Sequence, residues 1–116
     1  MNNVAVLNIV GLTERLLGSD ATPFLNQWSK GRIQHIQPLL PAVTCSVQAT
    51  YLTGKWPNEH GIVGNGWFHK DYQEIKFWHQ SNKLIQSPLI WDELKRENPE
   101  FTCANMFWWF NMYSSV

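Results

Sequence analysis

The sequence predicts an α/β fold, with a mostly parallel sheet flanked by helices and a β-hairpin insertion. Three observations lead to this prediction. Candidate strands and helices alternate through the first half of the chain. The strand candidates are short apolar runs without a helical period, as in strands that are buried on both faces. Later in the chain, two aromatic-rich runs flank a polar turn, which is typical of a hairpin.

The first half supplies a strand, a helix and a second strand. Residues 4–10 are apolar and β-branched, so we expect a buried strand there. Thr22 and Pro23 fit the N-cap and the first turn of a helix that ends at Gly31. The expected buried positions of that helix are Phe24, Leu25 and Trp28. Residues 33–37 alternate between apolar and polar side chains and predict the next strand.

The second half supplies a hairpin, a helix and a further strand. We expect the hairpin over residues 67–78, with its polar turn at 69–71. The helix opens at Ser87-Pro88 and closes at Asn98-Pro99, because the residue before a proline disfavours helical geometry. Residues 101–107 form the next buried strand candidate.

Composition limits the classes of partner and compartment. The 116 residues allow at most one small domain, and a hydrophobic content of 44% is enough for a core. The 9 basic and 9 acidic residues balance without a charged block, so we expect no nucleic-acid polymer and no membrane surface as partner. No signal peptide or membrane-spanning segment is recognised. The two cysteines fit no zinc or redox motif and indicate a reducing, cytoplasmic location.

The stretch from residue 38 to residue 68 is the most informative part of the chain. Pro38 and Pro41 end the preceding strand, since proline offers no N–H to a ladder. Residues 46–53 predict a helix with Gly54 as its left-handed C-cap. Thr44 therefore lies at or near a helix N-terminus, where unpaired N–H groups and the helix dipole favour a phosphate.

The same stretch carries a spaced motif. Thr44 is followed nine positions later by Thr-Gly, then by a proline and by a His-Gly-Ile-Val-Gly-Asn run that ends at Asn65, 21 positions after Thr44. The residues are Thr53, Gly54, Pro57 and 60–65. In order and spacing the motif resembles the nucleophile segment of the type I phosphodiesterase/nucleotide pyrophosphatase branch of the alkaline phosphatase superfamily.

The resemblance implies a reaction and roles for two residues. It implies hydrolysis of a phosphodiester or pyrophosphate in a small, nucleotide-like substrate, through a phospho-threonine intermediate on Thr44. Asn65 would hold a non-bridging phosphoryl oxygen. Two divalent metals, zinc being the expected one, would assist the attack, with Thr44 as one ligand. The aromatic residues after Asn65 would stack on the substrate or belong to the core: Trp67, Phe68 and Tyr72.

The metal ligands depart from the family pattern. The family places an aspartate directly before a glycine at the end of the first strand, and the matching dipeptide here is Val10-Gly11. Asn8 lies two residues earlier on the same strand face and offers an amide oxygen instead. Glu14 and Asp20 are nearby alternatives. The other ligands of the family are aspartates and histidines in later segments.

Family members are several times longer than this sequence, and their sheet continues. The resemblance thus implies that residues 1–116 are the N-terminal portion of a single alkaline-phosphatase-like α/β domain. The remainder of that domain is expected to pack on it.

Rival interpretations remain open at this level. Cys45 could be a nucleophile, since helix N-termini acidify thiols, but a cysteine phosphatase needs an arginine where this chain has Tyr51. The four histidines show no zinc spacing, and His60 is expected to brace the turn that begins at Pro57. With Val10 at the metal position, the chain could also be a non-catalytic relative that binds a phosphorylated ligand or a partner, or an inactive folding fragment.

Overall fold

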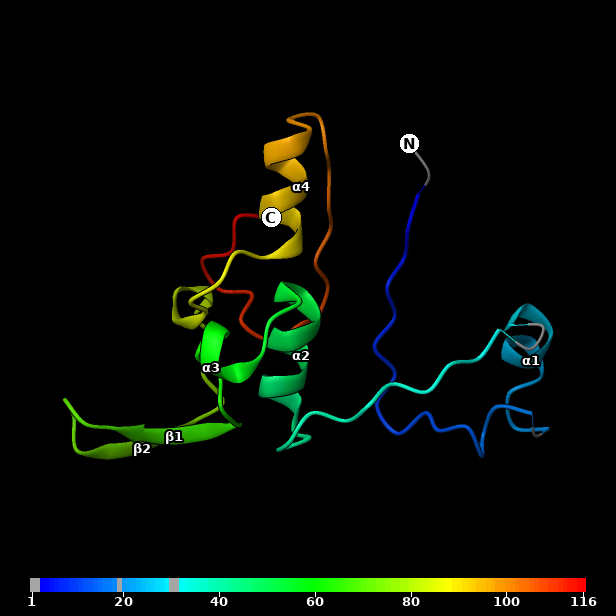
Figure 1. Cartoon of the computed structure of the whole chain (residues 1–116), viewed down its shortest axis with the longest axis horizontal. Helices are drawn as coiled ribbons and strands as arrows, with labels where there is room; N and C mark the ends of the chain where they lie inside the picture. The colour runs from blue at the N-terminus through cyan, green and yellow to red at the C-terminus, as the bar shows by residue number, and fades with distance from the viewer. Residues whose placement is uncertain (1–2, 19, 30–31) are drawn as a thin grey trace. The chain divides into compact units, whose positions relative to one another are not determined.

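The computed structural model describes residues 3–18, 20–29 and 32–116, in two compact units, Met1–Gln37 and Pro38–Val116. Figure 1 shows the chain from its N-terminus in blue to its C-terminus in red. The fold mixes helices with one small antiparallel sheet. Each unit is described by itself.

The first unit contains the helix α1, Pro23–Ser29. Pro23 occupies its first position, and the Thr22 carbonyl accepts a hydrogen bond from the Asn26 amide (3.0 Å), as predicted for an N-cap residue. The predicted end at Gly31 lies outside the described residues. The expected buried face does not form, because Phe24 and Trp28 are 73% and 67% exposed and the described residues of α1 include none that is buried.

The prediction of a mostly parallel sheet is wrong for the described residues. Residues 4–10, 33–37 and 101–107 form no strand, and the sheet has two antiparallel strands. A strand exists only when a neighbouring strand accepts and donates its backbone hydrogen bonds. No neighbour of that kind occurs among the described residues, so these apolar runs stay outside any sheet, with Val4 and Val10 largely exposed.

The second unit begins with two helices joined by a tight connection. Helix α2 covers Thr44–Thr53, two residues longer at its start than predicted, and Gly54 ends it in the left-handed region (φ 64°) with its N–H on the Thr50 carbonyl (2.8 Å). The short helix α3, Pro57–His60, contacts α2 and also ends on a left-handed glycine. The predicted C-cap is therefore confirmed.

A hairpin follows, as predicted, with β1 at Gly66–His69 and β2 at Glu74–Phe77. The register pairs Trp67 with Lys76 and Phe68 with Ile75. Because side chains alternate along a strand, Trp67 and His69 share one face with Lys76, and Phe68 lies on the other. The chain then passes through the 3₁₀ turn η1, Asn82–Leu84, to α4, Ile90–Glu97, which ends before Pro99 as predicted.

Two small clusters form the core of the second unit. One joins Cys45, Ala49, Ile62 and Phe110, and the other joins Leu52, Leu89 and Trp91. The C-terminal segment runs beside α2 and α4, in orange to red in Figure 1, and the Trp109 amide donates to the Gln48 side chain (2.7 Å). Segments distant in sequence thus complete the core around α2.

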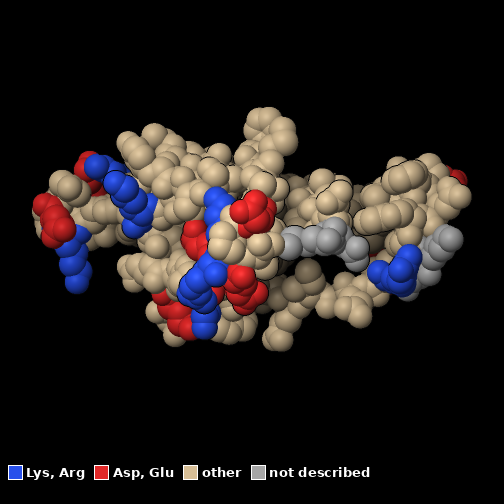
Figure 2. Space-filling view, turned by 90° about the horizontal axis from the view of Figure 1, so that it is seen from above, with Lys and Arg blue, Asp and Glu red and all other residues tan. Residues whose placement is uncertain are grey.

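Two surface properties concern possible partners. Figure 2 shows basic and acidic side chains intermixed on the visible face, without an area of one sign. Among the described residues, no helix has the length and apolar character that a membrane crossing requires.

Candidate functional site

At the start of α2, the side chain of the N-cap residue accepts no hydrogen bond from the backbone N–H groups of the first turn. Val43 occupies the N-cap position in an extended conformation (φ −118°, ψ 159°) and has no side chain able to bond the first turn. Thr44 is the first helical residue and is half-buried. The buried Ser46 hydroxyl donates to the carbonyls of Pro41 (2.9 Å) and Val43 (3.2 Å), which fixes the entering chain against the first turn.

Asn65 reaches this helix start from 20 residues further along the chain. Its side-chain Oδ1 accepts a hydrogen bond from the Cys45 amide (2.9 Å). Because a backbone N–H can only donate, the oxygen of the Asn65 amide must face Cys45 and the Nδ2 group must face away. The Asn65 carbonyl also accepts from the Trp78 amide (2.8 Å), so both ends of the residue are held. No described residue accepts a hydrogen bond from Asn65 Nδ2.

The two residues that the motif selected therefore lie at one helix terminus. Asn65 satisfies one of the N–H groups at the start of α2, the task that an N-cap side chain normally performs. Among the described residues its Nδ2 has no hydrogen-bond acceptor, so one amide donor remains next to the Cys45 N–H of the first turn. A helix N-terminus with an added amide donor suits an anion such as a phosphoryl group.

His60 fixes the loop that carries Asn65. Its side chain is fully buried, its Nδ1 accepts from the Ile62 amide (3.0 Å), and its Nε2 lies 3.0 Å from the Thr50 hydroxyl. Since Nδ1 must be the unprotonated nitrogen, Nε2 carries the hydrogen of the neutral ring and donates to Thr50. Burial lowers the pKa of His60, which favours this neutral form. The bonds tie the loop after α3 to the middle of α2.

Cys45 is not suited to nucleophilic attack. Its side chain is 1% exposed in the core cluster with Ile62 and Phe110, and burial raises the pKa of its thiol to about 11. The desolvation penalty on the thiolate therefore exceeds the stabilisation expected from the helix N-terminus. The burial of Cys45 adds to the argument from Tyr51 against a cysteine nucleophile.

The three candidate stacking residues do not form one surface. Trp67 is half-buried and packs against the core cluster that contains Cys45. Tyr72 is exposed in the hairpin turn, where its ring lies 6.4 Å from the His69 ring and 4.8 Å from the Lys76 ammonium. Phe68 lies on the opposite face of the hairpin and is half-exposed.

The candidate metal ligands near the N-terminus belong to the first unit, and their position relative to Thr44 is not described. Asn8 and Asp20 are exposed, and Glu14 pairs with His35 (3.2 Å). No group of three or more His, Cys, Asp or Glu side chains converges among the residues that the structure describes. Thr44 and Asn65 supply one hydroxyl and one amide, a donor set that does not fit two divalent metals by itself.

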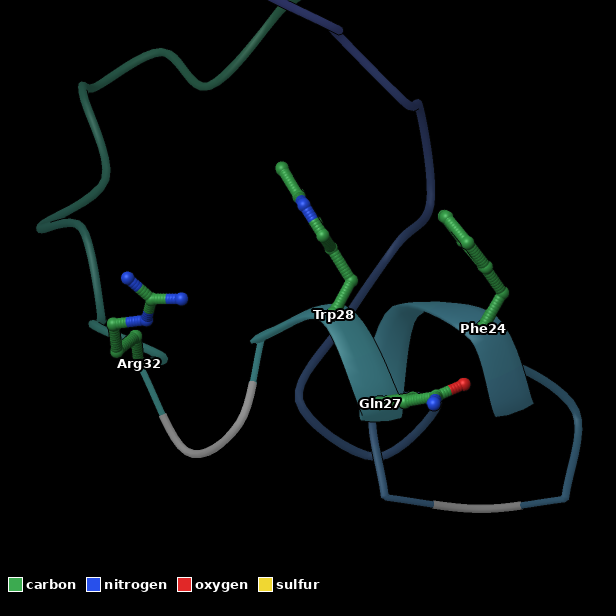
Figure 3. Close-up of a pocket in the computed structure, with 4 residues that line it drawn as sticks. All are labelled: Phe24, Gln27, Trp28 and Arg32. Atoms are coloured by element: carbon green, nitrogen blue, oxygen red, sulfur yellow. The ribbon is translucent and has the colours of Figure 1, made fainter.

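A pocket in the first unit involves none of the predicted site residues. Phe24, Gln27, Trp28 and Arg32 line it. Figure 3 shows Phe24 and Trp28 projecting from α1, with Arg32 in the segment that follows. Its aromatic side chains, Phe24 and Trp28, are mostly exposed.

The sequence analysis did not predict one close pair of side chains. His69 and His79 approach each other with 2.8 Å between their Nε2 atoms. Ten residues separate them, and no metal-binding spacing relates them. The hairpin prediction placed His69 in the turn and His79 beyond the second strand, so it gave no signal for their contact.

A comparison against known families agrees with the resemblance that the motif carries. The model of the family "Type I phosphodiesterase / nucleotide pyrophosphatase" matches residues 4–116, and the chain belongs to this family. It is a family of phosphodiesterase- and pyrophosphatase-type hydrolases that act on small, nucleotide-like phosphorylated substrates and generally use divalent metals. Searches among curated proteins and among solved structures returned no match.

Proposed function

We propose that this chain contributes the nucleophile and one oxyanion donor to the hydrolysis of a phosphodiester or pyrophosphate in a small nucleotide-like substrate. The observation that carries the proposal is the hydrogen bond from the Cys45 amide to Asn65 Oδ1. It turns Asn65 Nδ2 away from the Cys45 amide, at the start of the helix whose first residue is Thr44. The family membership supports the reaction class.

The reaction has two displacement steps. The Thr44 oxygen attacks phosphorus, the bond from phosphorus to the leaving oxygen breaks, and a phospho-threonine forms. The hydroxyl proton passes to water, and the leaving group departs with its oxygen and the bonding electron pair. Water then attacks the phosphorus, and the threonine oxygen leaves and regains a proton. In both steps Asn65 Nδ2 and the N–H groups of the first turn of α2 face the charge that develops on the non-bridging oxygens.

Divalent metals, with zinc the expected one, would supply Lewis-acid assistance to a threonine hydroxyl, which is a weak nucleophile by itself. Thr44 and Asn8 are the ligands that this chain would offer, with Glu14 and Asp20 as alternatives to Asn8. The described residues do not assemble a metal site by themselves. We further propose that residues 1–116 form part of one α/β domain.

The substrate's base or leaving group would contact the hairpin. Trp67 and Tyr72 both lie beside His69, within ring distances of 5.5 and 6.4 Å, and are the better placed of the three aromatic candidates. Phe68 lies on the other face, so a single stacked group would not reach all three.

Thr44→Ala tests the nucleophile in the intact natural protein. No described residue hydrogen-bonds the Thr44 hydroxyl, so the substitution should leave folding unchanged while it abolishes turnover of an activated phosphodiester such as bis(p-nitrophenyl) phosphate. Thr44→Ser keeps a hydroxyl and should retain measurable turnover. Trapped phosphate on residue 44 after rapid acid quench would identify the intermediate, and unchanged turnover in Thr44→Ala would end the assignment.

A second candidate function is supported by Val10 at the position of the family's metal aspartate. The same helix terminus would then bind a phosphorylated ligand without cleaving it. Calorimetry with a nucleoside monophosphate separates the two. The non-catalytic interpretation is favoured if the parent protein binds the nucleoside monophosphate, if Asn65→Ala loses this binding, and if added zinc produces no turnover.

A further inference from the structure

His69 and His79 form a close pair at the hairpin, and among the described residues no hydrogen bond joins either side chain to Thr44 or Asn65. Their Nε2 atoms lie 2.8 Å apart, and their ring centroids lie 4.8 Å apart with the planes at 61°. Both side chains are half-buried. The two nitrogens therefore converge on one point at the surface.

The backbone holds this convergence in place. His69 is the last residue of β1, and His79 follows β2 after Trp78, whose left-handed conformation (φ 59°) interrupts the alternation of the strand. Trp78 is fixed by its amide bond to the Asn65 carbonyl. The Trp67 ring lies 5.5 Å from the His69 ring and 4.9 Å from the His79 ring, so it supports both imidazoles from the core side.

The protonation state of the histidine pair allows it to act as a metal ligand. A hydrogen bond between two imidazole nitrogens needs one N–H and one lone pair, so the pair is incompatible with two doubly protonated rings. Burial lowers the pKa of His79, with further lowering from His69 and the Lys76 ammonium. The nearby Glu74 carboxylate is engaged by Lys76 (2.7 Å). At neutral pH at least one Nε2 lone pair is thus available.

We propose that His69 and His79 bind one divalent transition metal of the zinc–copper class through their Nε2 atoms. Imidazole nitrogen is the ligand that these ions share. Two such nitrogens on one tetrahedral zinc, each at about 2.0–2.1 Å, lie about 3.3 Å apart, so the rings would separate by only about half an ångström. The donor ring moves its hydrogen from Nε2 to Nδ1, with no net proton release, and water fills the other positions. Metal binding by the pair does not require the proposed hydrolysis, although Trp67 and Tyr72, the proposed stacking residues, lie beside His69.

Copper binding tests the site without reference to activity. The purified, metal-free protein is titrated with Cu²⁺ by calorimetry, beside the variants His69→Ala, His79→Ala and the control His35→Ala, which removes an exposed histidine of the first unit. We expect one tight equivalent in the parent and in the control. Each pair variant should weaken it at least about tenfold, since even the loss of an outer-shell partner has that effect on metal binding.

Electron paramagnetic resonance of the parent protein decides the case if either alanine variant fails to fold. Hyperfine coupling to two imidazole nitrogens, lost in the milder variant His79→Gln, supports the pair. Absence of a tight equivalent, or equal binding in the pair variants, would show that the histidines are a hydrogen-bonded pair only. Weakening of the same equivalent by Thr44→Ala would assign the metal to the other site and overturn the proposal.

Discussion

Asn65 caps helix α2 through its Oδ1 and would serve the proposed chemistry through its Nδ2. Substitutions can separate these two roles. Asn65→Ala removes the acceptor for the Cys45 amide and the Nδ2 donor together. It should cost about 1 kcal/mol of unfolding free energy, as the loss of an N-cap does. Turnover should fall by about 10²–10³, as on removal of one oxyanion donor. Urea unfolding and the phosphodiester assay measure the two effects.

Asn65→Asp is the matched control. A carboxylate still accepts from Cys45, so stability should stay near that of the parent protein, but it donates no hydrogen bond and repels a phosphoryl group. Turnover should therefore fall at least as far as in Asn65→Ala. Parent-like activity in Asn65→Asp would show that the residue acts only as a cap.

His60 should make stability fall with acid. Burial lowers its pKa in the folded state, although Glu59 and a backbone hydrogen bond oppose the shift. Below the ordinary histidine value of about 6.5, the unfolded chain takes up a proton that the folded chain resists, so the unfolding free energy decreases as the pH falls. The contribution of His60 to the unfolding free energy is fully present above a pH of about 6.5 and is lost as the pH falls through the lowered pKa of the folded state. Urea midpoints across this range measure the slope.

The contribution of His60 is isolated by His60→Gln, which cannot titrate. The slope of stability between neutral and mildly acidic pH should flatten in that variant and stay unchanged in His35→Gln, which alters an exposed histidine. His79 has a lowered pKa as well, so some slope should remain. An undiminished slope in His60→Gln would contradict the assignment.

At the scale of single residues, the spacing of the motif selected Thr44 and Asn65, and the structure brings the Asn65 side chain to the amide of Cys45, the second residue of α2. The burial of Cys45 could not be predicted, since Ile62 and Phe110 create it and both arrive from elsewhere in the chain. The brace by His60 was anticipated, whereas its bond to Thr50 was not.

Among the elements, the hairpin requires glycine at position 66 because a side chain there would collide with β2, not because of the backbone conformation. A Cβ at Gly66 would lie 2.5 Å from the Phe77 ring and 2.9 Å from the Lys76 carbonyl, and the carbonyl cannot move without shifting β2. Gly66→Ala should therefore destabilise the hairpin by about 1–3 kcal/mol, as overpacking does. Because the Asn65 carbonyl bonds to Trp78, the change should also displace Asn65.

Gly64→Ala is the control for that substitution. The nearest atom to a Cβ there lies at 3.6 Å, an ordinary contact, so the variant should unfold near the parent protein. Urea unfolding compares the two, and amide exchange across β1 and β2 localises the effect. Equal stability of both alanine variants would contradict the packing argument.

Elements with local signals were predicted, and those that need distant partners were not. Gly54 and the Asn98-Pro99 pair marked helix ends, and the polar turn marked the hairpin, since these residues act through their own backbone. The strand at residues 4–10 depends on a ladder partner, which hydrophobicity alone cannot supply.

At the scale of the whole molecule, the second unit depends on a C-terminal segment without helix or strand. Its backbone is held by side chains of earlier elements: Asn82 Nδ2 donates to the Phe110 carbonyl (3.1 Å), and Lys95 Nζ donates to the Ser115 carbonyl (2.6 Å). Phe110 carries this segment into the cluster under α2. The core therefore closes only when residues separated by most of the unit meet.

Two phenylalanines of this segment measure how far stability depends on that closure. Phe110 is 1% exposed and Phe107 is 93% exposed, and both have left-handed backbones, with φ of 59° and 62°. An alanine substitution thus changes the backbone preference about equally at both positions, so the difference in stability between the two variants reports the burial of the side chain. Phe110→Ala should cost about 3–5 kcal/mol, a large share of the stability of a small domain. Phe107→Ala should stay within about 0.5 kcal/mol of the parent protein. Urea unfolding followed by tryptophan fluorescence gives both values, and comparable losses would mean that Phe110 does not close the core.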